Sequence, residues 1–320
     1  MGTVFVTGIS GQDGSFLAEQ LGEDGHDVVG VLRKGRVPRG RAVPGIAYVE
    51  WDFVDVDALR ALLVERRPNA FYNFAAFSTG AGMFDDAAAI GEFNGVAVAR
   101  MLQAIVETDP EVRFCQASSS EMYGDPVVSP QDERTPFRPL SPYGAAKLFA
   151  HTTIGAYRER HGAFACSAIL YNHESPRRSP AFVTRKIADA VARIRAGEQG
   201  ELLLGNLEAR RDWGYAPDYV RAMRLMLAQE RPGDYVVATG EPHSVREFCE
   251  VAFSHAGLDY RDWVKENTAD LRHDTRGPLT GNASKAREQL GWRPMTDFAA
   301  LVRLMVDASI AALASKDSNT

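Results

Sequence analysis

The first half of the chain alternates short apolar runs with segments whose apolar residues recur every three or four positions. Runs of β-branched residues are typical of strands, and the longer spacing is typical of amphipathic helices. The predicted strands are 4–7, 28–32, 47–50, 70–74, 113–117 and 166–170, and the predicted helices are 15–21, 56–67, 96–106 and 143–160. This alternation predicts a parallel sheet covered by helices on both faces, in an α/β fold.

The alternation becomes less regular beyond Tyr171. A proline-rich stretch, ESPRRSPAF, precedes a predicted helix at 183–196, short strand-like runs at 202–204 and 235–238, and helices at 219–229, 244–256 and 298–313. We therefore expect a first domain over residues 1–171 and a smaller mixed α/β region over 172–315 that returns in part to the first domain. Residues 316–320 are expected to be a frayed tail.

Composition and charge narrow the function classes. The 320 residues are 45% hydrophobic and 24% charged, with a formal net charge of -6, which opposes a broad basic surface for nucleic acid. No segment reaches the uninterrupted apolar length of a membrane span, and a strand beginning a few residues after Met1 leaves no room for a signal peptide. We expect a cytoplasmic protein with no nucleic-acid or membrane partner.

Cysteine, histidine and arginine positions refine this expectation. The three cysteines lack short spacing and the seven histidines form no H-x-x-H pattern, so the sequence predicts buried thiols in a reducing compartment and no metal site. Basic residues gather at 33–41, 177–178, 185–186 and 210–211. Each island alone fits a solvated helix face, but together they favour a small anionic ligand.

A glycine-rich turn directly follows the first predicted strand. Gly8, Gly11 and Gly14 recur every third residue, with Gln12 and Asp13 between them. Glycines also mark ordinary tight turns, but a turn between the first strand and the first helix of a doubly wound sheet is the phosphate cradle of a Rossmann-type dinucleotide site. We therefore expect these five residues to bind a dinucleotide.

The ends of later strands extend this expected cofactor site. Strand two ends in Arg33, where an acidic residue would hold the 2′-hydroxyl of NAD, so NADP is favoured and NAD is less expected. The alternative is an exposed loop charge. Asp52, followed by Phe53, is placed to accept from the adenine amino group, although aspartate is also a common turn residue. Ala75 and Ala76 would let the backbone approach the ribose.

Tyr143 and Lys147 indicate hydroxyl chemistry. They lie four residues apart at the start of a predicted helix, and therefore on one face. A nearby ammonium is expected to stabilise the phenolate and so to lower the pKa of the tyrosine. A Y-x-x-x-K pair alone is common and usually structural, but it gains weight from the glycine turn and from Ser119, which ends a strand about two dozen residues earlier.

Glu121 is the most informative residue near this strand end. A carboxylate has no role in simple alcohol oxidation, but it is the group needed to remove a proton α to a newly formed ketone. Its structural alternative is a cap or an ion pair with a nearby arginine. The candidate catalytic residues are therefore Ser119, Glu121, Tyr143 and Lys147.

Six long segments carry a resemblance to a known family. TGISGQDGSFLAEQL, ASSSEMYG, SPYGAAKLFA, NHESPRR, FVTRKI and LGNLEARRDWGYAPDYV look like the GDP-mannose 4,6-dehydratase family, within the extended short-chain dehydrogenase/reductase superfamily. The similarity continues to KAREQLGWRP. It implies that 1–171 binds NADP and holds the catalytic residues, whereas 172–315 mainly binds a sugar nucleotide.

The resemblance also implies residue roles. Tyr143 would deprotonate the C4 hydroxyl while NADP⁺ takes the C4 hydride, and Lys147 would tune Tyr143 and hold the nicotinamide ribose. Glu121, with Ser119, would remove the C5 proton and assist loss of the C6 hydroxyl, after which the hydride returns to C6. His173 would lie by the cofactor, and the substrate-binding residues would be Ser78, Asn172, Glu174, Val183, Lys186, Arg211 and Arg272.

The sequence departs from the family pattern at the sugar pocket and near the nucleotide. AAQSHV after strand four is replaced by residues 75–80, a glycine after the paired arginines by Ser179-Pro180, and an acidic position near Arg272 by Thr275. A shorter loop after strand two replaces a segment used in tetramer contacts, so a homodimer and a homotetramer are both expected. The alternatives are an epimerase or decarboxylase acting on another sugar nucleotide, and, in another class, a non-catalytic NADP-binding sensor or scaffold.

Overall fold

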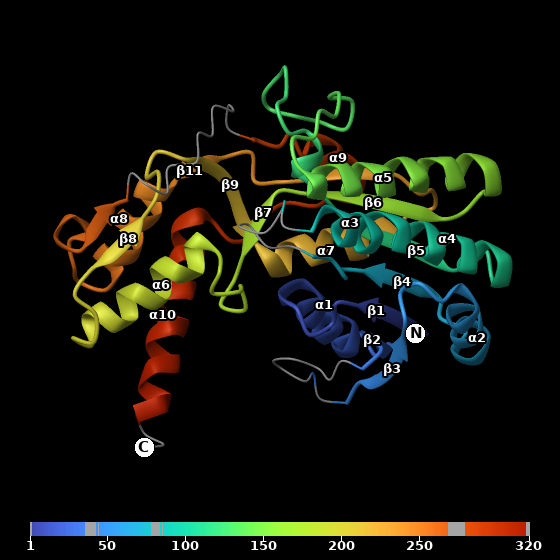
Figure 1. The fold of residues 1–320 in the computed structure, drawn as a ribbon, viewed down its shortest axis with the longest axis horizontal. Helices are drawn as coiled ribbons and strands as arrows, with labels where there is room; N and C mark the ends of the chain where they lie inside the picture. Colours follow the sequence, from blue (N-terminus) through green and yellow to red (C-terminus); the bar gives the residue numbers. More distant parts are fainter. Residues whose placement is uncertain are drawn as a thin grey trace.

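The computed structural model of the chain describes residues 2–35, 43, 45–77, 84, 86–267 and 279–317. Within these residues the main sheet has seven parallel strands in the order β10-β6-β5-β4-β1-β2-β3 (Figure 1). The strands are β1 (Thr3–Thr7), β2 (Asp27–Arg33), β3 (Ala47–Trp51), β4 (Ala70–Asn73), β5 (Arg113–Ser119), β6 (Ala165–Leu170) and β10 (Asp234–Val237). The strand order reverses between β1 and β4, and ligands of such sheets bind beyond the carboxyl ends of the strands at that point.

Two separate apolar cores lie on the two faces of this sheet. One contains Val4 and Val6 of β1 with α1 (Gln12–Glu23), α7 (Ala216–Leu227) and α9 (Ser284–Leu290). The other contains Phe5 of the same strand with α2 (Val56–Arg66), α4 (Ala97–Thr108) and α5 (Pro142–His161). Successive side chains of a strand point to opposite faces, so the continuous apolar run of β1 serves both cores. The doubly wound α/β prediction is confirmed.

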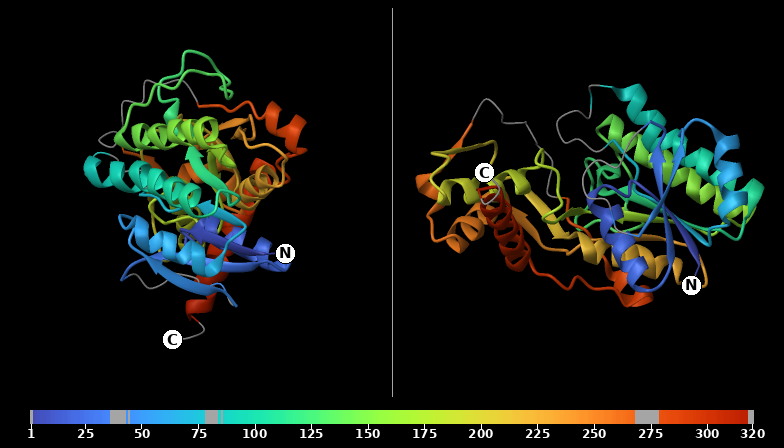
Figure 2. Two further views of the ribbon diagram at one scale, coloured as in Figure 1. Left: turned by 90° about the vertical axis from the view of Figure 1, so that its right-hand side faces the viewer. Right: turned by 90° about the horizontal axis from the view of Figure 1, so that it is seen from below.

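A second lobe is built from α6 (Val183–Arg195), α8 (Val245–His255) and α10 (Phe298–Asp317), with the strand pair β8 (Leu202–Leu204) and β12 (Val264–Glu266) and the turn η3 (Tyr260–Asp262). It has its own buried core, which includes Trp213 and Phe248. Figures 1 and 2 show this lobe beside the main sheet, joined to it by several crossings of the chain.

A small sheet connects the two lobes. It has the order β11-β9-β7, with β7 (Asn172–Glu174), β9 (Arg210–Tyr215) and β11 (Pro242–Ser244). The chain then returns to the first lobe, where α7 packs against α1 and β10 pairs with β6 at the sheet edge. Apolar periodicity predicted the strand at 235–238 but none of the three strands of the connecting sheet.

The segment before α4 also differs from its prediction. The sequence predicted one helix over 96–106, whereas the structure has α3 (Ala87–Gly91), a π-helical turn η1 (Glu92–Val96) and α4 in continuous succession. π-Turns are rare and are frequent at functional sites. The turn carries Phe93, whose ring reaches the candidate site described below.

One described helix, α10, is long and apolar enough over Phe298–Ser315 to cross a membrane by length and composition alone. Arg303 and Asp307 interrupt the apolar residues of this window, so it is not the uninterrupted apolar run that the sequence analysis considered. Leu301, Val302, Met305 and Val306 of this helix lie in the core of the second lobe, and core helices of globular proteins meet the same criterion.

Candidate active site

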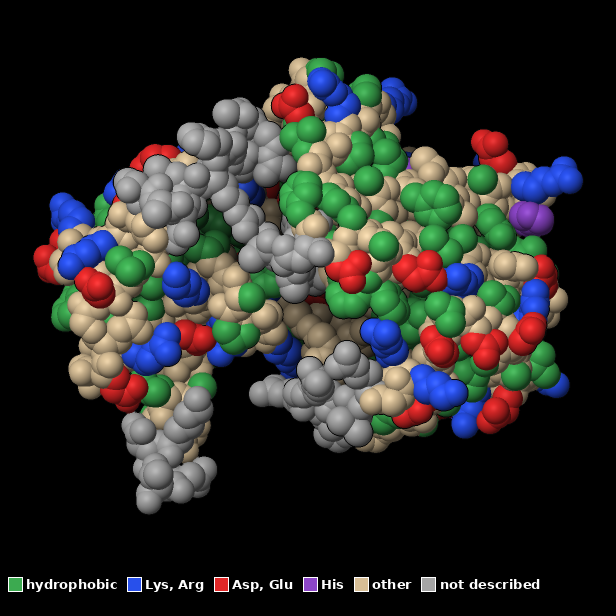
Figure 3. Space-filling model, viewed as in Figure 1, with side chains coloured by type: hydrophobic (Ala, Val, Ile, Leu, Met, Phe, Trp, Pro, Cys, Tyr) green, Lys and Arg blue, Asp and Glu red, His purple; other side chains and the backbone are tan. Residues whose placement is uncertain are grey.

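A cavity of about 560 Å³ lies beyond the carboxyl end of β1, where the strand order reverses. Figure 3 shows a hollow between the two lobes with lysine and arginine side chains at its border. The cavity is lined by the glycine turn, by the end of β2, by the residues that follow β4 and by the loop before α6, together with two phenylalanines: Gly8, Ile9, Ser10, Gly11, Gln12, Asp13, Gly14, Val31, Leu32, Arg33, Phe53, Phe74, Ala75, Ala76, Phe77, Phe93, Arg177, Arg178, Ser179 and Phe182.

The glycine turn at one end of this cavity has no room for side chains. Gly8 has φ +65°, and a Cβ at Gly14 would lie 2.4 Å from the carbonyl oxygen of Gly8. The turn leads directly into α1, so its backbone N–H groups and the positive end of the helix dipole are available to an anion. This geometry fits the pyrophosphate of a dinucleotide.

Another part of the cavity lining is aromatic and basic. The guanidinium of Arg33, at the end of β2, lies 4.4 Å from the ring centroid of Phe93. Phe53 and Phe77 also pack against Phe93, with ring centroids 6.2 and 4.9 Å away. Phe53 lines the cavity, whereas Asp52 is exposed, accepts from the backbone N of Val54 at 3.5 Å and is outside the lining. An adenine contact by Asp52 stays a prediction.

A second cavity of about 160 Å³ adjoins the first. The two share five lining residues: Asp13, Phe74, Ala76, Arg178 and Phe182. All four candidate catalytic residues line the smaller cavity, together with Asn172 and His173. The structure thus brings together side chains from β5, α5 and β7 at one opening of the large cavity.

Lys147 is held at the base of the smaller cavity. Its Nζ donates to the carbonyl oxygen of Ala117 at 2.7 Å and lies 5.7 Å from the ring centroid of Tyr143. Burial lowers the pKa of Lys147 to about 8, although the Asp13 carboxylate acts in the opposite direction.

The pKa of Tyr143 differs in sign from the sequence-based expectation. Burial raises it to about 12, the Glu121 charge adds to the increase, and a hydrogen bond with Ser119 opposes it. The expected net lowering was wrong, because removal of the phenol from water outweighs the groups that favour the phenolate, Ser119 and Arg178.

Ser119 is the last residue of β5 and caps the short 3₁₀ turn that follows, η2 (Ser120–Met122), which carries Glu121. The Oγ of Ser119 accepts from the backbone N of Glu121 at 3.2 Å, so the serine caps the turn that carries the carboxylate. The start of α5 packs on this turn, with the Oγ of Ser141 accepting from the backbone N of Gly144 at 3.0 Å. The local structure therefore fixes Tyr143 and Glu121 relative to each other.

His173 faces two hydrogen-bond acceptors. Its Nδ1 lies 2.7 Å from the carbonyl oxygen of Tyr171 and its Nε2 lies 3.0 Å from the Asp13 carboxylate. Two acceptors require both ring nitrogens to carry protons, which is the imidazolium form. Burial lowers the pKa of His173, but Asp13 outweighs burial and the net pKa is raised, while the pKa of Asp13 is lowered in turn.

Arg178 lines both cavities but was not among the sequence-predicted site residues. Its guanidinium carbon lies 3.6 Å from the ring centroid of Phe182, and its Nε lies 3.1 Å from Glu174. Glu174, predicted to bind substrate, is 1% exposed, accepts from Thr184 at 2.6 Å and is outside both cavity linings. The basic island at 177–178 was a signal for this arginine.

Val183, Lys186 and Arg211, which were also predicted to bind substrate, do not line either cavity. Val183 begins α6, Lys186 donates from Nζ to the carbonyl oxygen of Leu203 at 2.7 Å, and Arg211 donates to that of Arg210 at 2.7 Å. Ser78 and Arg272 lie outside the described residues. Their substrate contacts stay predictions.

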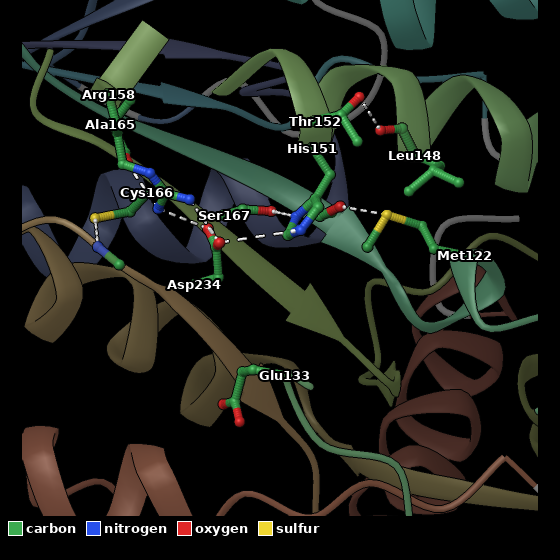
Figure 4. A network of polar contacts seen from close by, with 12 residues as sticks. Met122, Glu133, Leu148, His151, Thr152, Arg158, Ala165, Cys166, Ser167 and Asp234 are labelled. Carbon is green, nitrogen blue, oxygen red and sulfur yellow. Dashed lines mark hydrogen bonds and ion pairs between the residues drawn. The ribbon is translucent and has the colours of Figure 1, made fainter. Parts of the chain in front are cut away.

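A polar network lies between α5, the helix that carries Tyr143 and Lys147, and the neighbouring strand β6 (Figure 4). His151 of α5 contacts the Oγ of Ser167 with Nδ1 at 2.8 Å, and Arg158 binds both carboxylate oxygens of Asp234 at 2.8 and 2.6 Å. Burial lowers the pKa of His151, whereas Asp234 raises it and Arg158 lowers it further. The network joins α5 to β6 and to the edge strand β10.

In the part of the chain that the structure describes, no group of three or more His, Cys, Asp or Glu side chains is placed to hold a metal ion. The three cysteines are buried and unpaired with one another in disulfides.

Comparisons with known proteins agree over nearly the whole chain. A family model described as GDP-mannose 4,6 dehydratase matches residues 5–305. GDP-mannose 4,6 dehydratase 1 of Arabidopsis thaliana is 43% identical over 95% of this chain and 89% of its own length. The Homo sapiens GDP-mannose 4,6 dehydratase is 41% identical over 95% and 90%. Among solved structures, the Thermus thermophilus UDP-glucose 4-epimerase complex with NAD has a TM-score of 0.85 at 26% identity, covering 97% of this chain and 99% of that chain.

Proposed function

The chain belongs to the GDP-mannose 4,6-dehydratase family, and we propose that it converts GDP-mannose, or a closely related sugar nucleotide, to the 4-keto-6-deoxy product with loss of water. The observation that carries this proposal is the position of Glu121. Its side chain lines the same small cavity as Tyr143 and Lys147, beside the dinucleotide-sized cavity.

The larger cavity supports a nicotinamide cofactor, and Arg33 supports NADP as that cofactor. The glycine turn fits the pyrophosphate, and the Arg33 guanidinium, at the end of β2 and in the cavity lining, would bind a 2′-phosphate. When bound, this cofactor supplies a reversible hydride acceptor and, in its oxidised form, a positive charge. Ala75 and Ala76 line the wall along which the ribose would lie.

Tyr143 acts as the base for the C4 hydroxyl. Burial holds its phenol protonated in the ligand-free protein, with the pKa raised to about 12, so proton transfer requires positive charge close to the developing phenolate. Lys147 supplies part of that charge at 5.7 Å from the ring centroid. The hydrogen bond with Ser119 also favours the phenolate.

Glu121 acts as the base for the C5 proton. A ketone at C4 acidifies the adjacent C–H, and a carboxylate at the cavity wall can take that proton and return it to the departing C6 hydroxyl. A simple alcohol dehydrogenase needs no such group. Asn172 lines the same cavity from β7 and is placed to orient the sugar.

Purified protein incubated with GDP-mannose and NADP⁺ tests the proposal. Mass spectrometry should show a product lighter than the substrate by one water, and NADPH should not accumulate. Tyr143→Phe should lose about 10²–10⁴-fold in rate, as is usual for a general acid-base residue. Glu121→Gln should block water loss while permitting C4 oxidation. A product that keeps its C6 hydroxyl would contradict the proposal and favour an epimerase.

The proposal extends to assembly and location. We propose a cytoplasmic homodimer or homotetramer, in keeping with the three buried, reduced cysteines. Analytical ultracentrifugation distinguishes the two assemblies, because their masses differ twofold.

A further inference from the structure

Helix α1, which begins at the glycine turn, is joined side chain by side chain to the loop that follows β7. Arg177 of this loop lies along α1. Its guanidinium binds both carboxylate oxygens of Glu19 at 2.8 Å and lies 3.8 Å from the ring centroid of Phe16. It also donates to the Oγ of Ser15 at 3.0 Å. Nη2 makes both contacts with Glu19 and Nη1 makes the contact with Ser15, so one guanidinium bonds to two side chains of α1.

The first turn of α1 makes a second set of contacts with His173 of β7 and with the loop that follows β7. Gln12 donates from Nε2 to the carbonyl oxygen of His173 at 3.0 Å and accepts from the Oγ of Ser175 at 2.8 Å. Asp13 pairs with His173 at 3.0 Å. These contacts occur at the residues that distinguish this glycine turn from a generic cofactor turn.

The end of β7 and the loop that follows it also form hydrogen bonds with the start of α6. Glu174 accepts from the Oγ1 of Thr184 at 2.6 Å, and Arg185 donates to the carbonyl oxygen of Pro176 at 2.7 Å. Between these fixed points lies Arg178, which lines both cavities. A continuous set of polar contacts therefore leads from the glycine turn, through the loop, to the helix that carries Val183 and Lys186.

We propose that the α1–loop clamp couples cofactor binding to sugar-nucleotide binding, and that Glu19 and Arg177 are positioning residues for the reaction. The clamp is defined by Gln12, Asp13 and Glu19 of α1 with His173 of β7 and with Ser175 and Arg177 of the loop that follows β7. The inference rests on the proposed function, because it assigns the two ligands to the two lobes.

Coupling follows from the place of the clamp. A dinucleotide seated on the glycine turn orders the first turns of α1, and the clamp transfers that order to the loop and to Arg178. A sugar nucleotide that contacts the start of α6 then meets a loop already held in place. By thermodynamic linkage, each ligand tightens the other by the same factor. Glu19 lies outside both cavity linings, so it affects the ligands only through Arg177.

The test measures a coupling factor rather than activity. NADPH and GDP bind without turnover, and calorimetry gives the dissociation constant of GDP with and without saturating NADPH. In the natural protein NADPH should tighten GDP binding by about 5-fold or more, within the usual range of allosteric coupling. In Glu19→Gln the factor should fall toward one, while the dissociation constant of NADPH alone changes by less than about threefold. Arg177→Lys, which keeps the charge but loses the separate donor to Ser15 and the planar group over Phe16, should also reduce the factor.

Glu23→Gln is the matched control, because Glu23 lies one turn further along α1 and is exposed. It should keep the natural coupling factor. An unchanged factor in both Glu19→Gln and Arg177→Lys, or the absence of coupling in a natural protein that binds both ligands, overturns the inference and leaves the proposed function standing. A natural protein that binds neither ligand overturns the proposed function, and the clamp with it.

Discussion

Gly144 of the catalytic helix lies directly against the backbone of Glu121. A Cβ at position 144 would be 2.5 Å from the carbonyl oxygen of Glu121, a distance that real Cβ atoms do not reach. Gly144 takes no part in the chemistry itself. It allows α5 to begin within van der Waals distance of the turn that carries the Glu121 carboxylate. The spacing between Tyr143 and Glu121 therefore depends on a missing side chain.

Gly144→Ala should move apart Tyr143 and Glu121, the two residues proposed above as bases. The added methyl group must push apart two backbone segments, which costs about 1–3 kcal/mol of unfolding free energy. We expect the rate of water loss to fall by at least about 10-fold, since small misplacements of reacting groups are costly. Gly155→Ala is the control, because a Cβ at position 155 would be 3.8 Å from its nearest heavy atom. This substitution should stabilise the helix by roughly 0.5–1 kcal/mol. Equal rates of water loss in Gly144→Ala and Gly155→Ala would show that the reaction does not depend on the spacing between Tyr143 and Glu121.

Lys147 should set the alkaline limit of activity. Its pKa is lowered to about 8 by burial, so kcat/KM should fall as the pH rises through about 8 and the ammonium loses its proton. The profile of kcat/KM reports groups of the free enzyme. Lys147→Arg retains the charge to far higher pH, so its alkaline limb should move upward even where its maximal rate is lower. A limb that stays at the same pH would assign it to another group.

The main sheet could be predicted because its strands are apolar on both faces. The runs at 4–7 and 166–170 are buried by helices on each side, and such runs read as strands without knowledge of their partners. The connecting sheet could not. β7 (NHE) and β11 (PHS) are three residues long and polar, and their stability comes from pairing with β9 across a long sequence separation rather than from a local pattern.

The candidate site shows the same division. Spacing alone placed Tyr143 and Lys147 on one helix face and the glycines at one turn, because these are local relationships. Arg178 was visible only as part of a basic island, since its role depends on the fold of the loop before α6. The sign of the Tyr143 pKa was missed because burial, which dominates it, is a property of the folded chain.

Arg33 should determine the preference for NADP. Removing its guanidinium in Arg33→Ala should weaken NADPH binding by about 10-fold to 100-fold, the loss of one charge-assisted hydrogen bond, and should leave NADH binding nearly unchanged. Fluorescence titration of both cofactors gives the ratio. Lys34→Ala is the neighbouring control; Lys34 is exposed and is not part of the cavity lining. Equal losses for NADPH and NADH would mean that Arg33 acts on the adenine half through Phe93 and not on a 2′-phosphate.

His151 should make the protein less stable in mild acid. Burial lowers its pKa below the value of about 6.5 that an unfolded histidine has, so the unfolded chain binds more protons at this position than the folded protein does. Stability from this group is therefore fully present above about pH 6.5 and is lost as the pH falls through the lowered pKa. The groups that face it are Ser167, Asp234 and Arg158.

His151→Gln keeps a side chain able to bond to Ser167 and removes the titration. Urea midpoints measured at pH 7 and pH 5 should fall less in this variant than in the natural protein. His161→Gln, at the exposed end of the same helix, should retain the full natural decrease. The pKa of His173, the histidine of the clamp, is raised, so its contribution has the opposite pH dependence. The stability that His173 contributes to the protein is lost as the pH rises above about 6.5. His173 is present in both proteins, so its contribution cancels when His151→Gln is compared with the natural protein. If the urea midpoint falls as much in His151→Gln as in the natural protein between pH 7 and pH 5, the network in Figure 4 does not titrate through His151.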